Sequence, residues 1–307
     1  MSSRRLALHA AWFVPAALVV AFLPRFISSY HALEWARVGY FFIALVGLNV
    51  LTGYSGQISL GHGAFMAIGG YTSAILIAHH GVRDVWTIPL AGLVAGGVGL
   101  AFGLPALRLR GLYLALATFG VAVAFPALVQ KFDHFTGGSA GLVLTLHPND
   151  WLYYLTWAIA GAGLVLGWLV LATPIGRSFR ALRDSEVAAV SSGISPALYK
   201  TLAFGVSSFY AGIAGSLVAI SGAYVTPQTF PITLSLFLVV GMAVGGIGSL
   251  PLGVVGAILI QFLPPFASNI SDQAPQVIEG AILVGVMLLL PGGAAGLLRL
   301  VQSSRQP

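Results

Sequence analysis

Long apolar blocks follow one another along almost the whole chain, and only short polar segments separate them. Each block has nearly the length that a helix needs to cross a hydrocarbon core of about 30 Å. The pattern therefore predicts an all-α polytopic membrane protein, with about ten spans in one transmembrane domain over residues 1–307. The predicted spans are residues 9–24, 36–53, 58–79, 87–107, 111–130, 151–172, 197–222, 231–248, 252–268 and 276–291.

The first apolar block has some features of a secretory signal peptide. Arg4 and Arg5 precede it, as basic residues precede the apolar part of a signal. No small-x-small cleavage site follows, however, and Pro24 and Arg25 stand at that place instead. We therefore expect this block to be a retained helix.

The composition supports a membrane protein and excludes several kinds of site. Hydrophobic residues make up 58% of the chain and the mean hydropathy is +0.94, well above the apolar share of soluble domains. About ten spans would use nearly all 307 residues, which leaves no room for a soluble catalytic domain. Because the chain has no cysteine, disulfides, thiolate metal sites and cysteine nucleophiles are excluded. We expect no metal ion and no cofactor on this chain.

Basic residues are distributed unevenly about the predicted spans, and the asymmetry predicts an orientation. With the N-terminus inside, ten basic residues fall in cytoplasmic segments, and only four fall outside, namely Arg25, Arg37, Arg83 and Lys131. The positive-inside rule favours this arrangement, which places both termini in the cytoplasm. The basic residues stand at span ends rather than in one patch, so the net charge of +6 does not indicate nucleic acid.

One apolar block, residues 51–71, contains interleaved glycines and polar side chains. Each glycine weakens a continuous helix by about 1 kcal/mol, and polar groups facing lipid are costly. The segment therefore predicts a broken helix near residues 53–63, a common way to build a transport site. The predicted path residues are Asn49, Tyr54, Gln57, Ser59, His62 and Thr118. For His62 alone, a hydrogen-bonded packing role is an open alternative.

A second glycine cluster occupies residues 241–256 and includes Gly245, Gly246, Gly248 and Pro251. It stands between two predicted spans. Two interpretations remain open for it, a tight cytoplasmic turn and a re-entrant element.

Residues 174–196 form the most conspicuous charged segment of a chain in which charged residues are only 7%. The spacing predicts a cytoplasmic helix near 177–192, with Arg180–Asp184 and Arg183–Glu186 pairs on an exposed face. The apolar residues on the other side of this helix are Phe179, Leu182, Val187 and Val190. Arg177 adds a further charge near its start, and Gly193 suits the position that ends the helix.

Such a polar helix in an otherwise apolar chain favours docking to a water-soluble partner. The alternative is an interfacial helix that rests on anionic lipid. After Gly193, Ser195 suits the N-cap and Pro196 the first position of the following span.

Several segments resemble the membrane subunits of bacterial ABC importers of the branched-chain amino acid (Liv-type) class. Residues 48–71 are similar to that family's Asn-x-Leu-x-Gly-Tyr-x-Gly-x-x-Ser-Leu-Gly segment, and residues 111–120 to a Tyr-Leu-Ala-x-x-Thr stretch of the M-type subunit. Residues 176–204 resemble the loop that engages the ATPase. Residues 245–249 and 290–296 resemble the C-terminal pattern. The resemblance extends in order over residues 40–300 and is closer to the M-type than to the H-type permease.

The resemblance implies a permease that works by alternating access in the bacterial inner membrane. Its expected partners are a homologous permease in a heterodimer, two ATP-binding cassette ATPase subunits and a periplasmic solute-binding protein, besides membrane lipid. ATP and Mg²⁺ would bind the ATPase subunits, since this chain has no Gly-x-x-x-x-Gly-Lys phosphate loop. The residues implied in ATPase coupling are Arg177, Arg180, Arg183, Asp184, Glu186 and Gly193.

Two other function classes compete with this interpretation. A self-contained carrier or channel commonly places charged groups in the middle of its spans, and this chain has few, with Glu279 near the outer end of the last predicted span. An intramembrane enzyme would need paired aspartates or a His-Glu-x-x-His motif, which the sequence does not contain. The solute stays open among branched-chain amino acids, urea, amides and carboxylates.

Overall fold

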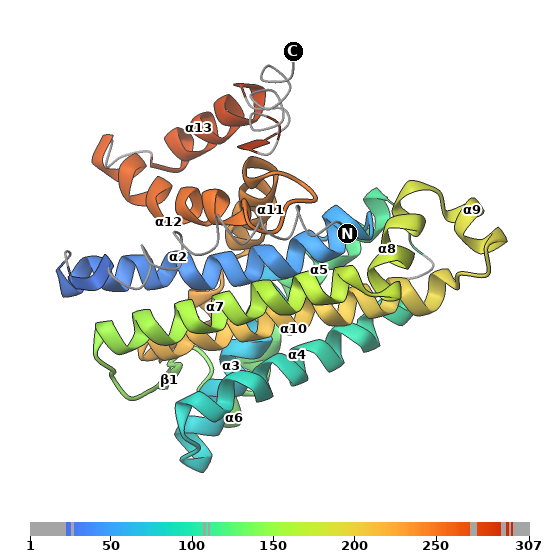
Figure 1. The fold of residues 1–307 in the computed structure, drawn as a ribbon. Coiled ribbons are helices and arrows are strands. Elements are labelled where there is room, and N and C mark those ends of the chain that lie inside the picture. The colour runs from blue at the N-terminus through green and yellow to red at the C-terminus, as the bar shows by residue number, and fades with distance from the viewer. Residues whose placement is uncertain are drawn as a thin grey trace.

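The computed structural model describes residues 23–25, 28–106, 109, 111–270, 275–289, 293–294 and 296. Within them the chain is almost entirely helical (Figure 1). The helices are η1 (Leu23–Arg25), α2 (Ser29–Leu48), the π-helix η2 (Asn49–Tyr54), α3 (His62–His80), α4 (Asp84–Ala106), α5 (Leu112–Lys131), α6 (Asp133–Thr136), α7 (Asn149–Ala172), α8 (Pro174–Asp184), α9 (Glu186–Ser191), α10 (Pro196–Gly222), η3 (Pro227–Thr229), α11 (Ile232–Gly245), α12 (Gly253–Ile270) and α13 (Pro275–Leu289).

The prediction of an all-α polytopic membrane protein is confirmed, but the count of about ten spans is not. In the described ranges six helical segments are long and apolar enough to cross a membrane. The predicted span 276–291 falls on α13, whose 15 residues extend only about 22 Å. The predicted span 9–24 lies outside the described residues except at its last two positions, so it stays a prediction.

The start of α2 corrects one predicted boundary. The sequence predicted a span at 36–53 with Arg37 near its outer end, whereas α2 begins at Ser29. The helix extends earlier because its polar first turns are satisfied locally, with His31 Nδ1 2.8 Å from the carboxylate of Glu34. Arg37 consequently lies about 12 Å from the start of the helix, where its side chain is exposed.

Helix α10 is the central element of the bundle and packs along α4, α3 and α2 (Figure 1). Small residues make these approaches possible: Gly69 on α3 faces the backbone of Gly212, and Gly215 faces the carbonyl of Met66. Dispersion between close backbones replaces the hydrophobic effect, which lipid cannot supply. Small residues on α3, α4 and α10 therefore lie at helix contacts.

We expect Gly215→Ala to destabilise the bundle by about 2 kcal/mol. The added Cβ would overlap the Met66 carbonyl oxygen, and a backbone atom cannot rotate aside as a side chain would. Thermal unfolding of the purified protein in detergent measures the effect. Gly97→Ala on α4 is the matched control, because nothing lies within 4 Å of its Cβ. Equal midpoints for the two variants would contradict this contact.

The two ends of the bundle differ. At one end β1 (Leu142–Val143) pairs with β2 (Tyr224–Val225) in an antiparallel ladder, a small exception to the all-α prediction. His147 forms an ion pair with Asp84 at this end and stacks near Trp151. At the other end α8 and α9 lie outside the bundle (Figure 1).

Candidate functional site

The predicted helix break lies between α2 and α3. Helix α2 continues as the π-helix η2, and residues 56–61 then run without helix until α3 begins at His62. Gly56 has a φ of +73°, a left-handed conformation that suits glycine, and it packs against Arg183. Thr52 Oγ1 donates to the Gln57 carbonyl at 2.9 Å and closes the turn. The interrupted helix that the sequence predicted is present.

Asn49 joins this break to the loop between α11 and α12. Its Nδ2 donates to the carbonyl oxygens of Gly246 at 3.3 Å and Ser249 at 3.1 Å, and its Oδ1 accepts the Gly248 N–H at 2.8 Å. The side chain is 1% exposed. Tyr54 adds a bond to the same loop, because its hydroxyl donates to the Gly248 carbonyl at 2.7 Å.

The second glycine cluster is therefore a turn and not a re-entrant element. Helix α11 ends at Gly245, and α12 begins at Gly253 after a short non-helical connection. The polar atoms of this turn find partners in Asn49 and Tyr54, about 200 residues earlier in the chain.

The other predicted path residues are also buried and hydrogen-bonded within the chain. Gln57 Nε2 donates to Ser55 Oγ at 2.7 Å and to the Lys200 carbonyl at 3.2 Å. Ser59 Oγ accepts from the Gly61 N–H at 3.4 Å. The bond from Gln57 to Lys200 joins the break to the start of α10.

Two more predicted path residues hold the beginning of α3. Thr118 Oγ1 on α5 accepts the Leu60 N–H at 2.9 Å and donates to the Ala115 carbonyl at 2.9 Å. His62 Nε2 lies 3.0 Å from the Ala44 carbonyl, so this nitrogen carries the proton and donates. That bond agrees with the packing alternative for His62, while its role in a solute path stays a prediction.

Helix α8 is bonded to the same region through two arginines one turn apart. Arg183 Nη1 donates to the Gly53 carbonyl at 2.8 Å, and Arg180 Nη2 donates to the Leu171 carbonyl at 3.3 Å. Gly53 lies in the last turn of η2 and Leu171 in the last turn of α7, where the carbonyls have no intrahelical partner. Cations at these C-terminal ends are also favoured by the helix dipole. Helix α8 therefore caps two neighbouring long helices.

The contacts around the break form one structure, which we call the polar junction. It consists of Asn49, Tyr54, Gln57, Arg183 and the loop 246–249. It links α2, α8, α10 and the α11–α12 turn at a single end of the bundle.

The charged segment differs from the predicted single helix at 177–192. It forms α8 and α9, separated at Ser185, whose extended backbone breaks the helix and whose hydroxyl caps α9 through the Ala188 N–H. The predicted pairs are also replaced. Arg183 pairs with Asp184 at 2.9 Å, and Glu186 with Lys200 at 2.9 Å, while Arg180 turns to the Leu171 carbonyl.

The boundaries after α9 are as the sequence predicted. Gly193 follows α9 with a φ of +79°, Ser195 is the N-cap of α10, and Pro196 is its first residue. Arg177 lies exposed on α8 and has no ion pair among the described residues.

Helix α9 projects from the bundle, beyond α8 (Figure 1). The four residues of the predicted apolar face are divided between α8 and α9 and differ in burial. Phe179 and Leu182 on α8 are buried, whereas Val187 and Val190 on α9 are 79% and 52% exposed. The buried pair attaches α8 to the bundle, and the exposed pair leaves α9 with an uncovered apolar surface.

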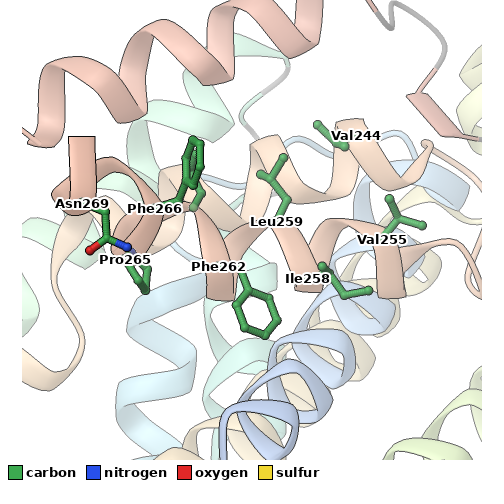
Figure 2. Close-up of a pocket in the computed structure, with 9 residues that line it drawn as sticks. Val244, Val255, Ile258, Leu259, Phe262, Pro265, Phe266 and Asn269 are labelled. Carbon is green, nitrogen blue, oxygen red and sulfur yellow. The ribbon is translucent and has the colours of Figure 1, made fainter. Parts of the chain in front are cut away.

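A separate apolar groove runs along one side of α12. Figure 2 shows Ile258, Phe262 and Phe266 from this helix, with Val244 contributed by α11. The spacing places one continuous face of α12 along it. Asn269 is its single polar lining residue, so the groove suits acyl chains or another helix rather than a polar solute.

Sequence reasoning missed three parts of this site. Ser235 on α11 accepts the Gly63 N–H at 3.0 Å, and the Lys200 carbonyl and the Glu186–Lys200 pair hold the start of α10. The polar residues near the two glycine clusters were the sequence signal that could have predicted these contacts. Glu279 lies on α13, and its side chain is outside the described residues.

Comparison with known proteins gives a consistent result. The sequence model of the family described as branched-chain amino acid transport system / permease component matches residues 35–291. The high-affinity branched-chain amino acid transport system permease protein LivM of Escherichia coli strain K12 is 32% identical over 315 residues, covering 92% of this chain and 74% of that protein.

Two more distant relatives from the same strain also match. LivH, another permease protein of the branched-chain amino acid system, is 24% identical over 281 residues, covering 82% of this chain and 89% of that protein. The galactofuranose transporter permease protein YtfT is 27% identical over 273 residues, covering 80% of this chain and 76% of that protein. No solved structure matches the chain.

A bundle of apolar helices that is joined by a polar junction, with two short helices outside it, defines a polytopic membrane protein. The family match covers most of the chain. The protein belongs to the family of branched-chain amino acid transport permease components, as the sequence resemblance indicated.

Proposed function

We propose that this chain is the membrane half of an ATP-driven importer in the bacterial inner membrane, and forms one side of the path for branched-chain amino acids or related small solutes. The α8–α9 end faces the cytoplasm, where both chain termini also lie. This orientation follows the positive-inside rule, because Arg177, Arg180, Arg183 and Lys200 all lie at that end.

The proposed partners follow from the relatives' membership in multicomponent transport systems. A homologous permease completes the path as a heterodimer, two ATPase subunits bind ATP and Mg²⁺ below, and a periplasmic protein delivers the solute. This chain itself is not an enzyme. Lys131 and Lys200, its only lysines, stand outside any phosphate-binding glycine loop.

One observation carries the proposal: α8 caps the ends of α2 and α7 while α9 projects beyond it with exposed valines. A movement of α9 by a bound ATPase would reach the bundle through α8. Arg183 would then pull on the helix break through the Gly53 carbonyl. The other residues proposed for ATPase coupling lie in the same α8–α9 segment or directly after it, namely Arg177, Asp184, Glu186 and Gly193.

The path residues have a defined part in this proposal. In the described conformation Asn49, Tyr54, Gln57, Ser59, His62 and Thr118 are bonded inside the protein. Alternating access needs a second arrangement, in which the break opens and some of these groups turn to the solute. The polar junction would therefore be the closed state of the path at the cytoplasmic end.

Affinity purification of the tagged chain from native membranes tests the assembly, with quantitative mass spectrometry of the proteins that travel with it. We expect a second permease and two ATPase subunits in stoichiometric amounts. Val187→Glu with Val190→Glu should reduce ATPase recovery about tenfold or more, because charge would be buried at the contact. Val143→Glu, at an equally exposed valine at the opposite end, is the matched control.

Two outcomes would contradict the proposal. Recovery of this chain alone, stable and monodisperse, would favour a self-contained carrier or channel. Unchanged ATPase recovery in the double variant would assign the valines of α9 to the lipid surface instead.

A further inference from the structure

The start of α3 is held by side chains from two other helices. Its N-cap is Gly61, which has no side chain to accept a hydrogen bond from the first N–H groups of the helix. The Ser235 hydroxyl of α11 accepts the Gly63 N–H at 3.0 Å instead. The Thr118 hydroxyl of α5 accepts the Leu60 N–H, just before the helix, at 2.9 Å. We call these two hydrogen bonds the α3 caps.

Glycine residues allow both hydroxyl-bearing helices to approach this closely. A Cβ at Gly61 would lie 2.2 Å from the Thr118 carbonyl oxygen, and a Cβ at Gly63 would lie 2.7 Å from the Ser235 hydroxyl oxygen. A larger residue at either position would therefore push α5 or α11 away from α3. Thr118 and Ser235 are both 0% exposed. The α3 caps are thus closed to water in this conformation.

The helices on the two sides of the α3 caps differ in how firmly they are packed. Helix α3 meets α10 at the level of the backbone, where Gly69 faces Gly212 and Met66 faces Gly215. Most residues of α5 and of the η3–α11 segment, by contrast, are not buried in this chain, whereas α2 and α10 are mostly buried. Closely packed helices move as one body, and an element with few buried contacts can shift against it.

The α3 caps therefore join a firmly packed group of helices to two loosely packed ones. A neutral hydrogen bond changes the equilibrium between two states by about fivefold. Two such bonds are enough to favour a closed state and weak enough to break when the helices move. A different pair of hydroxyls lies inside the firmly packed group, where Ser73 Oγ on α3 is 2.6 Å from Ser216 Oγ on α10.

We propose that Thr118 and Ser235 are positioning residues for transport, which keep the helix break closed, and that opening of the path moves α5 and α11 away from the start of α3. In the open conformation the Leu60 and Gly63 N–H groups face the water of the path. The two hydroxyls act on the break through α3. The inference rests on the proposed function and names the two helices whose movement opens the break.

Cysteine accessibility tests this movement, because the chain has no native cysteine. Ser235→Cys and Thr118→Cys are made separately in the importer assembled with its ATPases, in inside-out membrane vesicles. Each is treated with a water-soluble methanethiosulfonate reagent, once without nucleotide and once with ATP and orthovanadate, which halts the ATPases in one conformation. We expect the labelling rate of each cysteine to differ at least about tenfold between the two conditions, because the caps are buried in one state and open to water in the other.

Ser216→Cys is the matched control. Its hydroxyl is equally buried and also meets a hydroxyl of another helix, but both helices belong to the firmly packed group. We expect no labelling of this cysteine under either condition.

A further variant measures the coupling between the two caps. Ser235→Ala removes one cap and should favour the open conformation, so that Thr118→Cys is labelled about fivefold faster under the condition in which it reacts more slowly. Ser216→Ala should leave the labelling of Thr118→Cys unchanged.

Three results would overturn the inference. These are equal labelling rates of the cap cysteines under both conditions, equal reactivity of Ser216→Cys, and unchanged labelling of Thr118→Cys in Ser235→Ala. If the importer in such a case still binds its ATPases and takes up leucine, the proposed function stands and the assignment of the α3 caps alone fails. Failure of the unmodified chain to bind ATPases would contradict the proposed function instead.

Discussion

Replacing Arg183 by alanine is expected to reduce solute uptake about ten- to hundredfold while leaving the importer assembled. Arg183 bonds the Gly53 carbonyl at the end of the α2–η2 helix, and a hydrogen bond from a charged donor contributes about 1.5–3 kcal/mol. Without it, α8 loses its direct bond to the helix break. ATP hydrolysis should continue but no longer drive transport. Uptake and ATPase rates in the same vesicles measure this separation.

Asp184→Ala is the matched control for this prediction. It removes the other partner of Arg183, but that ion pair is exposed, with the Asp184 side chain 65% accessible. Exposed ion pairs contribute little, so we expect uptake within about twofold of the natural protein. Normal uptake in Arg183→Ala, with normal expression and ATPase recovery, would contradict the proposed transmission through α8.

Asn49→Leu is expected to lower the free energy of unfolding by about 4 kcal/mol. The leucine keeps the approximate volume but leaves two carbonyls and the Gly248 N–H without their partner in a buried place. Such a loss is a large fraction of the stability of a folded domain. Denaturant unfolding of the detergent-solubilised complex measures it.

Asn269→Leu makes the same chemical change on an exposed position of α12 and should alter stability by less than about 0.5 kcal/mol. A similar stability for both variants would mean that the Asn49 bonds are replaced by water or by neighbouring groups.

The sequence predicted those features that local pattern controls. Apolar length predicted the helices, the glycine and polar residues of 51–71 predicted the break, and Gly193 and Pro196 marked the helix ends. The family resemblance was confirmed because its motifs are also local and ordered along the chain.

Features that depend on distant partners were not predictable in this way. The turn at 246–249 is a turn because Asn49 and Tyr54 satisfy its backbone, and Arg183 turns inward because the Gly53 carbonyl needs a donor. Residue spacing within 174–196 suggested ion pairs along one helix, but Arg180, Arg183 and Glu186 instead bond to residues of other elements. The start of α2 was predicted too late for a related reason, since local pairing at His31 and Glu34 extends α2 beyond its apolar block.

The polar junction also has a consequence for how the protein is made. Its bonds join Gly53 to Arg183 and Asn49 to Ser249, separations of 130 and 200 residues. At a synthesis rate of about 5–20 residues per second, the early helix break waits on the order of 10 s or more for these partners. During that time its polar groups need water or a protein chaperone in the membrane. Insertion of the last third of the chain is thus the step that completes the first third.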